Sequence, residues 1–284
     1  MLRKTLLTAS LLTTFGASAY TMETVTVDAP ITGIKNKAAV VLPSSYNEAT
    51  SYPVVYLLHG HGGNYRDWTN LTGVESLADH HNIIIVMPDG NRDSWYVDSK
   101  LKSNSDYATY ISKDVVNYID TNYNTINRVD GRGITGLSMG GFGAMSIGFN
   151  HLDTFGAIGA ISGGVDFTPF PNNWGISEVL GKYDENKTVW HQNAIINNLH
   201  KIKEYEMDGK VDTRVPISFE VGVGDFFLDV NRELHNTMLQ LNIKHDYTER
   251  QGQHNWDYWN NAIAYQMQFM NDALRKQGAF AIKG

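Results

Sequence analysis

Short apolar runs alternate along this chain with longer amphipathic segments. The runs at 54–58 (Val-Val-Tyr-Leu-Leu) and 83–87 (Ile-Ile-Ile-Val-Met) are continuously apolar, as is typical of strands covered on both faces. We expect eight strands, at Val25–Val27, Ala38–Leu42, Pro53–Leu58, Ile83–Met87, Gly133–Gly136, Ala157–Ile161, Pro216–Val221 and Asp246–Arg250. Helical periodicity is found at Tyr107–Tyr118, Gly140–Phe149, His191–Glu206, Val230–Leu241 and Asp257–Leu274. The alternation predicts an α/β fold with a mainly parallel sheet and helices on both faces.

One stretch departs from this alternation. The segment Phe167–Thr188 has weak periodicity and contains Pro169, Pro171 and two adjacent asparagines. Such a stretch predicts a loop excursion over one end of the sheet. We find no internal repeat and no linker that would divide the chain, so one domain is expected.

Composition excludes several classes of function and says less about the fold. The 284 residues are 42% hydrophobic and 19% charged, which excludes a disordered or collagen-like chain. Lys and Arg number 23 against 30 Asp and Glu, so the net charge of −7 offers no general basic field to attract nucleic acid. The absence of cysteine excludes disulfides, thiolate metal sites and a cysteine nucleophile.

The N-terminus has the pattern of a secretory signal peptide. A positive segment at Arg3-Lys4 precedes a mostly apolar stretch, Thr5–Gly16, and the small residues Ala17-Ser18-Ala19. The alternative, a membrane-spanning helix, needs a longer apolar run of about 20 residues. We expect residues 1–19 to be removed on export to the periplasm or medium. The remaining domain, 20–284, would carry a net charge of −9 and no stable membrane anchor.

The first chemical motif is Gly136-Leu137-Ser138-Met139-Gly140. It lies between the apolar run 133–135 and the helical pattern 142–149, which is the strand–turn–helix setting of a nucleophile elbow. Small residues are needed on both sides of Ser138 because this sharp turn brings the strand and helix backbones close together. The alternative is a glycine-rich turn with a solvated serine.

A serine nucleophile needs a histidine base oriented by a carboxylate, and in this setting the chain order is serine, acid, histidine. His254 follows the last expected strand in a loop, where it can reach the carboxyl edge of the sheet. Asp225 directly follows an earlier strand and is the expected acid, with Asp229 and Asp246 as alternatives; Asp229 has the position of a helix cap or first-turn residue. The other downstream histidines lie in helical patterns or begin a strand: His151, His191, His200, His235 and His245.

A second glycine-rich turn, His59-Gly60-His61-Gly62-Gly63, follows an early strand. Acyl transfer requires donors for an oxyanion, and we expect the backbone N–H groups of His61 and Met139 to supply them. His59 and His61 alternate as metal ligands sometimes do, but no third ligand has matching spacing. We therefore expect no metal and no cofactor, and interpret His59 as a buried residue that braces the loop.

Taken together, four motifs resemble the esterase D family of α/β-hydrolases, which includes feruloyl, acetylxylan and tributyrin-type esterases of carbohydrate esterase family 1, S-formylglutathione hydrolases and mycolyltransferases. They are His59-Gly60-x-Gly62-Gly63, Gly136-Leu137-Ser138-Met139-Gly140-Gly141, Gly224-Asp225-Phe226 and Gly252-x-His254-x-Trp256. The resemblance runs from about Lys35 to Phe269. It implies an α/β-hydrolase fold and an ester hydrolase that uses Ser138, Asp225 and His254.

The motifs do not identify the substrate. A signal peptide argues against the cytosolic S-formylglutathione hydrolases, and leaves an exported esterase that removes acetyl or feruloyl groups from plant polysaccharide or oligosaccharide. Aromatic side chains can stack on sugars or phenolics, and the candidates are Trp68, Trp95, Phe142, Phe226 and Trp256. Core packing is the alternative for each. Several alternatives stay open: a general short-chain acyl esterase or S-formylglutathione hydrolase-like enzyme, a peptidase or acyltransferase, and a non-catalytic carbohydrate-binding module with the hydrolase fold.

Overall fold

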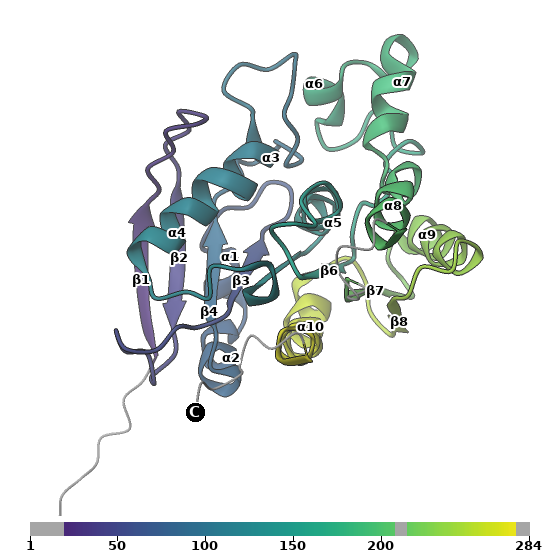
Figure 1. The fold of residues 1–284 in the computed structure, drawn as a ribbon. Helices are drawn as coiled ribbons and strands as arrows, with labels where there is room; N and C mark the ends of the chain where they lie inside the picture. The colour runs from purple at the N-terminus through teal and green to yellow at the C-terminus, as the bar shows by residue number, and fades with distance from the viewer. Residues whose placement is uncertain (1–19, 208–214, 277–284) are drawn as a thin grey trace, which may run out of the picture.

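The structure, a computed structural model, describes residues 20–207 and 215–276 and is built on one eight-stranded sheet (Figure 1). Along the sheet the order is β1-β2-β4-β3-β5-β6-β7-β8. β1 and β2 pair antiparallel to their neighbours, and the pairs from β4 through β8 are parallel. The strands are β1 (Thr21–Thr26), β2 (Lys37–Leu42), β3 (Val54–Leu58), β4 (Ile84–Pro88), β5 (Arg132–Gly136), β6 (Ala157–Ile161), β7 (Ile217–Gly222) and β8 (Asp246–Arg250). All eight predicted strands are confirmed to within a few residues.

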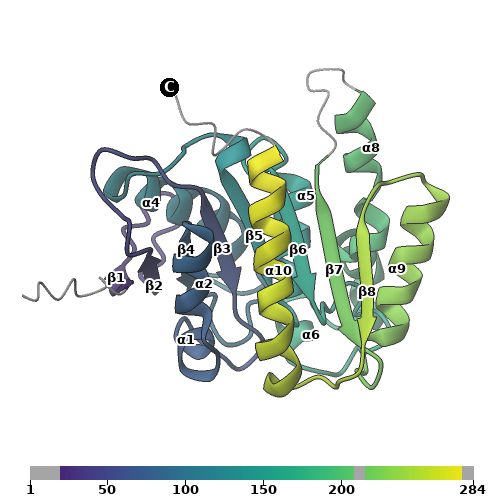
Figure 2. The ribbon, with the colours of Figure 1, turned by 90° about the horizontal axis from the view of Figure 1, so that it is seen from below.

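Helices cover both faces of the sheet. Figure 2 shows α10 (Trp256–Lys276) lying along β5 and β6 on one face, next to α2 (Val74–His81). α5 (Met139–Asn150) packs on the opposite face, and α9 (Leu228–Gln240) covers the same face near β7. The predicted helix at 107–118 is one continuous helical stretch: α3 (Tyr107–Thr109), a π-helical segment η1 (Tyr110–Val115) and α4 (Val116–Asn122). The expected α/β fold is confirmed.

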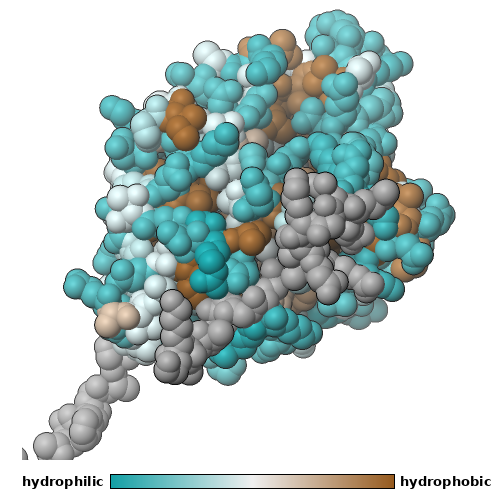
Figure 3. Space-filling view, in the orientation of Figure 1, coloured by the Kyte–Doolittle hydropathy of each residue, from teal (hydrophilic) through white to brown (hydrophobic). Residues whose placement is uncertain are grey.

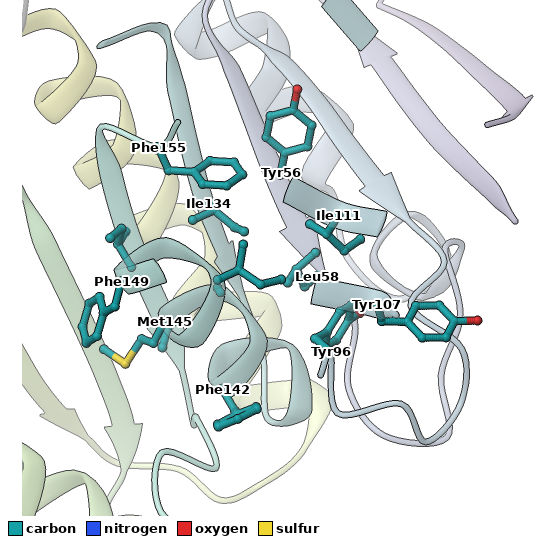
Figure 4. Close-up of a cluster of buried hydrophobic side chains, with 14 of the residues drawn as sticks. Tyr56, Leu58, Tyr96, Tyr107, Ile111, Ile134, Phe142, Met145, Phe149 and Phe155 are labelled. Atoms are coloured by element: carbon teal, nitrogen blue, oxygen red, sulfur yellow. The ribbon is translucent and has the colours of Figure 1, made fainter. Parts of the chain in front are cut away.

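Strand alternation divides the core in two. Val54, Tyr56 and Leu58 belong to the cluster beneath α5, whereas Val55 and Leu57 belong to the cluster beneath α10. Successive side chains of a strand point to opposite faces, so one apolar run serves both cores. Figure 4 shows the cluster under α5, where Phe155 lies beside Tyr56 and Ile134.

Two predictions around residues 167–206 are wrong. The expected loop contains α6 (Ile176–Leu180) and the start of α7 (Tyr183–Asn193), while the expected helix 191–206 is broken into the end of α7, a 3₁₀ turn η3 (Ile195–Asn198) and α8 (His200–Met207). Ala194 has extended backbone angles because the N–H of Ile195 bonds the carbonyl of Val165, 2.9 Å away. A contact distant in sequence thus interrupts the helix.

The remaining short elements are α1 (Asp67–Leu71), which was not predicted, and a 3₁₀ turn η2 (Val129–Gly131). α2 was not predicted either. Within residues 20–207 and 215–276, no helix is long and apolar enough to cross a membrane. The predicted signal peptide at 1–19 lies outside the described residues.

Candidate active site

Ser138 occupies the sharp turn between β5 and α5. Its backbone has φ 53° and ψ −116°, an unfavourable conformation for a residue with a side chain. A Cβ on Gly136 would lie 2.6 Å from the carbonyl oxygen of Gly140, and a Cβ on Gly140 would lie 2.5 Å from that of Leu58. Only glycine fits these two positions, so the predicted elbow has the expected geometry.

Asp225 follows β7 in a turn that its own backbone closes. Its N–H bonds the carbonyl of Gly222 at 3.0 Å, and its carboxylate accepts the N–H of Phe227 at 2.8 Å. The side chain is fully buried. A buried carboxylate needs a donor or a positive partner, and His254 is the second donor that faces it.

His254 lies in the loop between β8 and α10 and joins the other two residues. Its Nδ1 is 3.0 and 2.9 Å from the two carboxylate oxygens of Asp225, and its Nε2 is 2.8 Å from Ser138 Oγ. The Nδ1–H therefore donates to Asp225, which leaves the Nε2 lone pair to accept the serine hydroxyl. The ring is held by three aromatic neighbours, Phe226, Phe227 and Trp259, at centroid distances of 4.2, 5.4 and 4.9 Å.

The structure brings together the three residues that the sequence singled out, and leaves the alternative acids elsewhere. Asp229 is exposed in the first turn of α9, one of the two positions expected for it; the N-cap is Phe227, and no described side chain caps this helix. Asp246 is exposed at the start of β8. Chemically, the line from carboxylate through imidazole to hydroxyl can take the serine proton as the oxygen attacks a carbonyl.

Two backbone donors lie in the turns that were expected to bind an oxyanion. Among the described residues, neither the N–H of His61 nor that of Met139 has a hydrogen-bond acceptor. Their neighbours are engaged: Gly62 N–H bonds Arg92 O at 2.6 Å, and Gly140 N–H bonds Leu137 O at 2.6 Å. The neighbouring N–H groups are thus engaged within the protein, and these two donors are left free for a ligand.

His59 braces the first of these turns, as predicted. It is buried; its Nδ1 is 2.9 Å from Gly60 O, and its Nε2 accepts the N–H of Gly90 at 2.9 Å. Burial lowers the pKa of His59, so the neutral ring that this pattern requires is favoured. In the described part of the chain, no group of three or more His, Asp or Glu side chains is arranged to hold a metal ion.

Three of the five aromatic residues expected at the substrate rim lie in the core instead. Trp68 and Trp95 are each 1% exposed and Phe142 is 0% exposed. Trp68 donates its indole N–H to Leu58 O at 3.1 Å, and Phe142 lies on α5 within the cluster of Figure 4. The prediction that these three side chains contact substrate is therefore wrong; they pack inside the core.

Phe226 and Trp256 remain accessible. Phe226 is 48% exposed and stacks on Trp174, with the ring centroids 5.2 Å apart and the planes inclined by 20°. Trp256 is half-buried and meets Trp259 edge to face at 5.2 Å. Three further aromatic residues at this site were not predicted: Trp174, Phe227 and Trp259. Trp174-Gly175 within the irregular segment and the second Phe after Asp225 were the available signals.

A family model described as "Putative esterase" matches residues 29–270. The chain belongs to this Esterase family. An acetyl esterase from Caldicellulosiruptor saccharolyticus is 26% identical over 233 residues, covering 79% of this chain and 85% of that protein. An esterase from Mycobacterium tuberculosis is 35% identical over 129 residues, which is 44% of this chain and 28% of that protein.

Solved structures agree with the Esterase family assignment. A ferulic acid esterase superposes with a TM-score of 0.76 at 28% identity, covering 90% of this chain and 99% of its own. An S-formylglutathione hydrolase from Staphylococcus aureus gives 0.77 at 19% identity, covering 89% and 100%, a likeness of fold alone. The expected esterase resemblance and α/β-hydrolase fold are confirmed, and the chain is a carboxylic ester hydrolase.

Proposed function

We propose that this chain is an exported serine esterase in which Ser138 is the nucleophile, His254 the general base and Asp225 the residue that orients the base. The observation that carries the proposal is the unbroken hydrogen-bonded line from Asp225 through His254 to Ser138, with contacts of 2.8 to 3.0 Å. Its three members come from three different loops at one edge of the sheet, at the ends of β5, β7 and β8. Packing alone seldom aligns such a set.

In the acylation step, Ser138 Oγ attacks the ester carbonyl while His254 Nε2 takes the hydroxyl proton. The carbonyl oxygen becomes an oxyanion, which the N–H groups of His61 and Met139 stabilise. Collapse of this intermediate breaks the ester C–O bond, and His254 returns the proton to the departing alcohol. Water then attacks the acyl-enzyme by the same steps and releases the acid.

The substrates we propose are acetyl or feruloyl esters of plant polysaccharide or oligosaccharide. Similarity to an acetyl esterase and to a ferulic acid esterase supports these acyl groups. The accessible face formed by Phe226 and Trp174 supports a planar or sugar-like group near His254, because such rings bury apolar area against aromatic faces. Trp256, also accessible, is a further candidate contact. Export rests on the predicted signal peptide at residues 1–19.

Comparing two serine variants on p-nitrophenyl acetate tests the nucleophile. Ser138→Ala should lower kcat at least about 10³-fold with an unchanged melting temperature. The matched control is Ser146→Ala, on the same helix and half-buried, which should keep the wild-type rate. A Ser138→Ala rate within about tenfold of wild type would reject the assignment.

A substrate panel tests the acyl group and the bond. Methyl ferulate, acetylated xylan, p-nitrophenyl butyrate and a peptide amide are compared by kcat/KM. We expect methyl ferulate and acetylated xylan to give the highest kcat/KM and the amide to be inert. Equal rates on all the short esters would instead favour a general short-chain esterase, and cleavage of the amide would favour a peptidase.

A further inference from the structure

A buried carboxylate lies beside the proposed triad without belonging to it. Glu220, near the end of β7, is 4% exposed. Its Oε2 accepts a hydrogen bond from Nη1 of Arg250, at the end of β8, and one of 3.2 Å from the hydroxyl of Tyr258 on α10. The three residues therefore link two paired strands, β7 and β8, to α10 on one face of the sheet (Figure 2).

This cluster sits at the base of the loops that carry Asp225 and His254. Below the two side chains, the N–H of Val223 bonds Arg250 O at 2.8 Å, and that of Gly224 bonds Gly252 O at 2.9 Å. The ring of Tyr258 fills the space that a Cβ on Gly252 would need, and Gly252 has φ 151°. Both loops are thus tied to each other and backed by Tyr258.

Few charged or titratable groups lie around Glu220. Arg250 faces it from β8, Tyr258 faces it from α10, and Asp225 acts on Tyr258 from the following loop. The Arg250 guanidinium lies 3.9 Å from the ring centre of Tyr265, also on α10. β6, the other neighbouring strand, has no titratable side chain between Ala157 and Ile161. Arg250 is therefore the one positive group against the Glu220 carboxylate among the described residues that face it.

We propose that Glu220 is a positioning residue for the esterase reaction: its negative charge holds Arg250 and Tyr258 where they fix the loops of Asp225 and His254. The inference rests on the proposed triad. Neutralising Glu220 removes the carboxylate partner of Arg250 and leaves its guanidinium, among the described residues, only the ring of Tyr265. A half-buried guanidinium without a counter-charge moves toward water. The loop that begins at Arg250 carries His254. Movement of Arg250 therefore shortens the time that His254 Nε2 spends within hydrogen-bond distance of Ser138 Oγ.

Because Glu220 acts through its negative charge, its positioning role is sensitive to pH. Burial raises the pKa of Glu220 to about 7, against the opposing effect of Arg250. Because this pKa lies above the unfolded value of about 4.5, the folded state binds more protons than the unfolded state between these two pH values. Stability contributed by Glu220 is therefore lost as pH rises through this window, while the charged, positioning form is gained. Activity and stability should move in opposite directions.

The test compares kcat, KM and thermal melting from pH 5 to 9 for Glu220→Gln, Glu220→Asp and a control, Glu249→Gln. Glu249 also pairs with an arginine, Arg232, but on the exposed side of β8. We expect Glu220→Gln to lower kcat about tenfold at pH 8 with little change in KM. At acidic pH, kcat/KM of Glu220→Gln should depend on one protonation step, whereas that of the wild type should depend on two. The melting temperature of the wild type should fall between pH 5 and 7, and that of Glu220→Gln should not. Glu220→Asp should restore part of kcat, and Glu249→Gln should match the wild-type profile.

A folded Glu220→Gln enzyme with the wild-type kcat, or with a two-proton acid limb, would overturn the proposal. If that variant does not fold, Tyr258→Phe repeats the test by deleting only the hydroxyl, and an unchanged kcat and pH profile would be equally negative. These results are separable from failure of the triad itself, because an active Ser138→Ala enzyme would reject the triad whatever Glu220 does.

Discussion

At the residue scale, the candidate site depends on a few side chains that burial, hydrogen bonds and aromatic contacts hold in place. Asp225 cannot move toward water because it is fully buried and its carboxylate already accepts the Phe227 N–H. His254 is bounded by three aromatic rings that leave its ring plane little freedom. The hydrogen bond from Nδ1 to Asp225 therefore selects the tautomer whose Nε2 is free to accept a proton.

The prediction at this scale concerns that tautomer. Asp225→Asn presents an amide to Nδ1 and favours the wrong tautomer, so kcat should fall about 10³- to 10⁴-fold with a much smaller change in KM. Steady-state kinetics on an aryl ester measure both constants. The matched control is Asp229→Asn, four residues on and exposed in the first turn of α9, which should stay within about twofold. Greater damage from Asp229→Asn would assign the acid to that residue.

At the element scale, the junction of β5 and α5 fixes where the serine points. The helix starts directly after Ser138, and its first turn packs against the end of β3, the strand that leads into the turn carrying His61. Close backbone contact thus couples the nucleophile to the expected oxyanion donors. Any side chain at the contact separates the two turns.

Gly140→Ala is the variant that tests this coupling. Its Cβ would lie 2.5 and 2.6 Å from the carbonyl oxygens of Leu58 and His59, which are backbone atoms and cannot rotate away. We expect a loss of about 1–3 kcal/mol in the free energy of unfolding and a fall in kcat of at least about tenfold. Gly73→Ala is the control, because the nearest atom to its Cβ is Ser76 Oγ at 3.9 Å. Urea melts and kinetics that are the same for both variants would contradict the account.

At the scale of the whole molecule, charge is the property that acts on substrate before any contact. The net charge of the full chain is −7, and it becomes −9 if residues 1–19, with Arg3 and Lys4, are removed. The face drawn in Figure 3 is mainly hydrophilic, with apolar residues in separate patches. Such a surface favours neutral, water-soluble esters over anionic ones.

The corresponding prediction is an asymmetric dependence on salt. For an acetylated uronate, kcat/KM should rise as NaCl increases from 10 to 150 mM. The Debye screening length shortens from about 30 Å to about 8 Å over this range, which weakens the repulsion between protein and substrate. For the matched neutral acetylated sugar, kcat/KM should stay nearly constant. The same salt series on both esters checks this, and a fall for the uronate would show a local positive field at the site.

Much of this protein could be predicted from the sequence because its signals are local. Continuous apolar runs specify buried strands such as β3 and β4 whatever surrounds them. The less apolar edge strands β1 and β8 were predicted as well. The elbow at Ser138 could also be predicted, because the sharp turn requires glycines at fixed positions within five residues. Asp225 and His254 followed from the rule that the ends of parallel strands meet at one edge.

Tertiary structure alone decided the features that depend on contacts distant in sequence. Three aromatic residues look like binding residues in the sequence, but the packing of helices on the sheet buries them: Trp68, Trp95 and Phe142. The half-buried Trp174 instead stacks on Phe226. The break at Ala194 comes from a hydrogen bond to Val165. Glu220 reads as an ordinary strand residue until pairing of β7 with β8 sets it against Arg250. Burial and strand pairing depend on residues that are distant in sequence but close in space, and a local sequence pattern does not specify which residues these are.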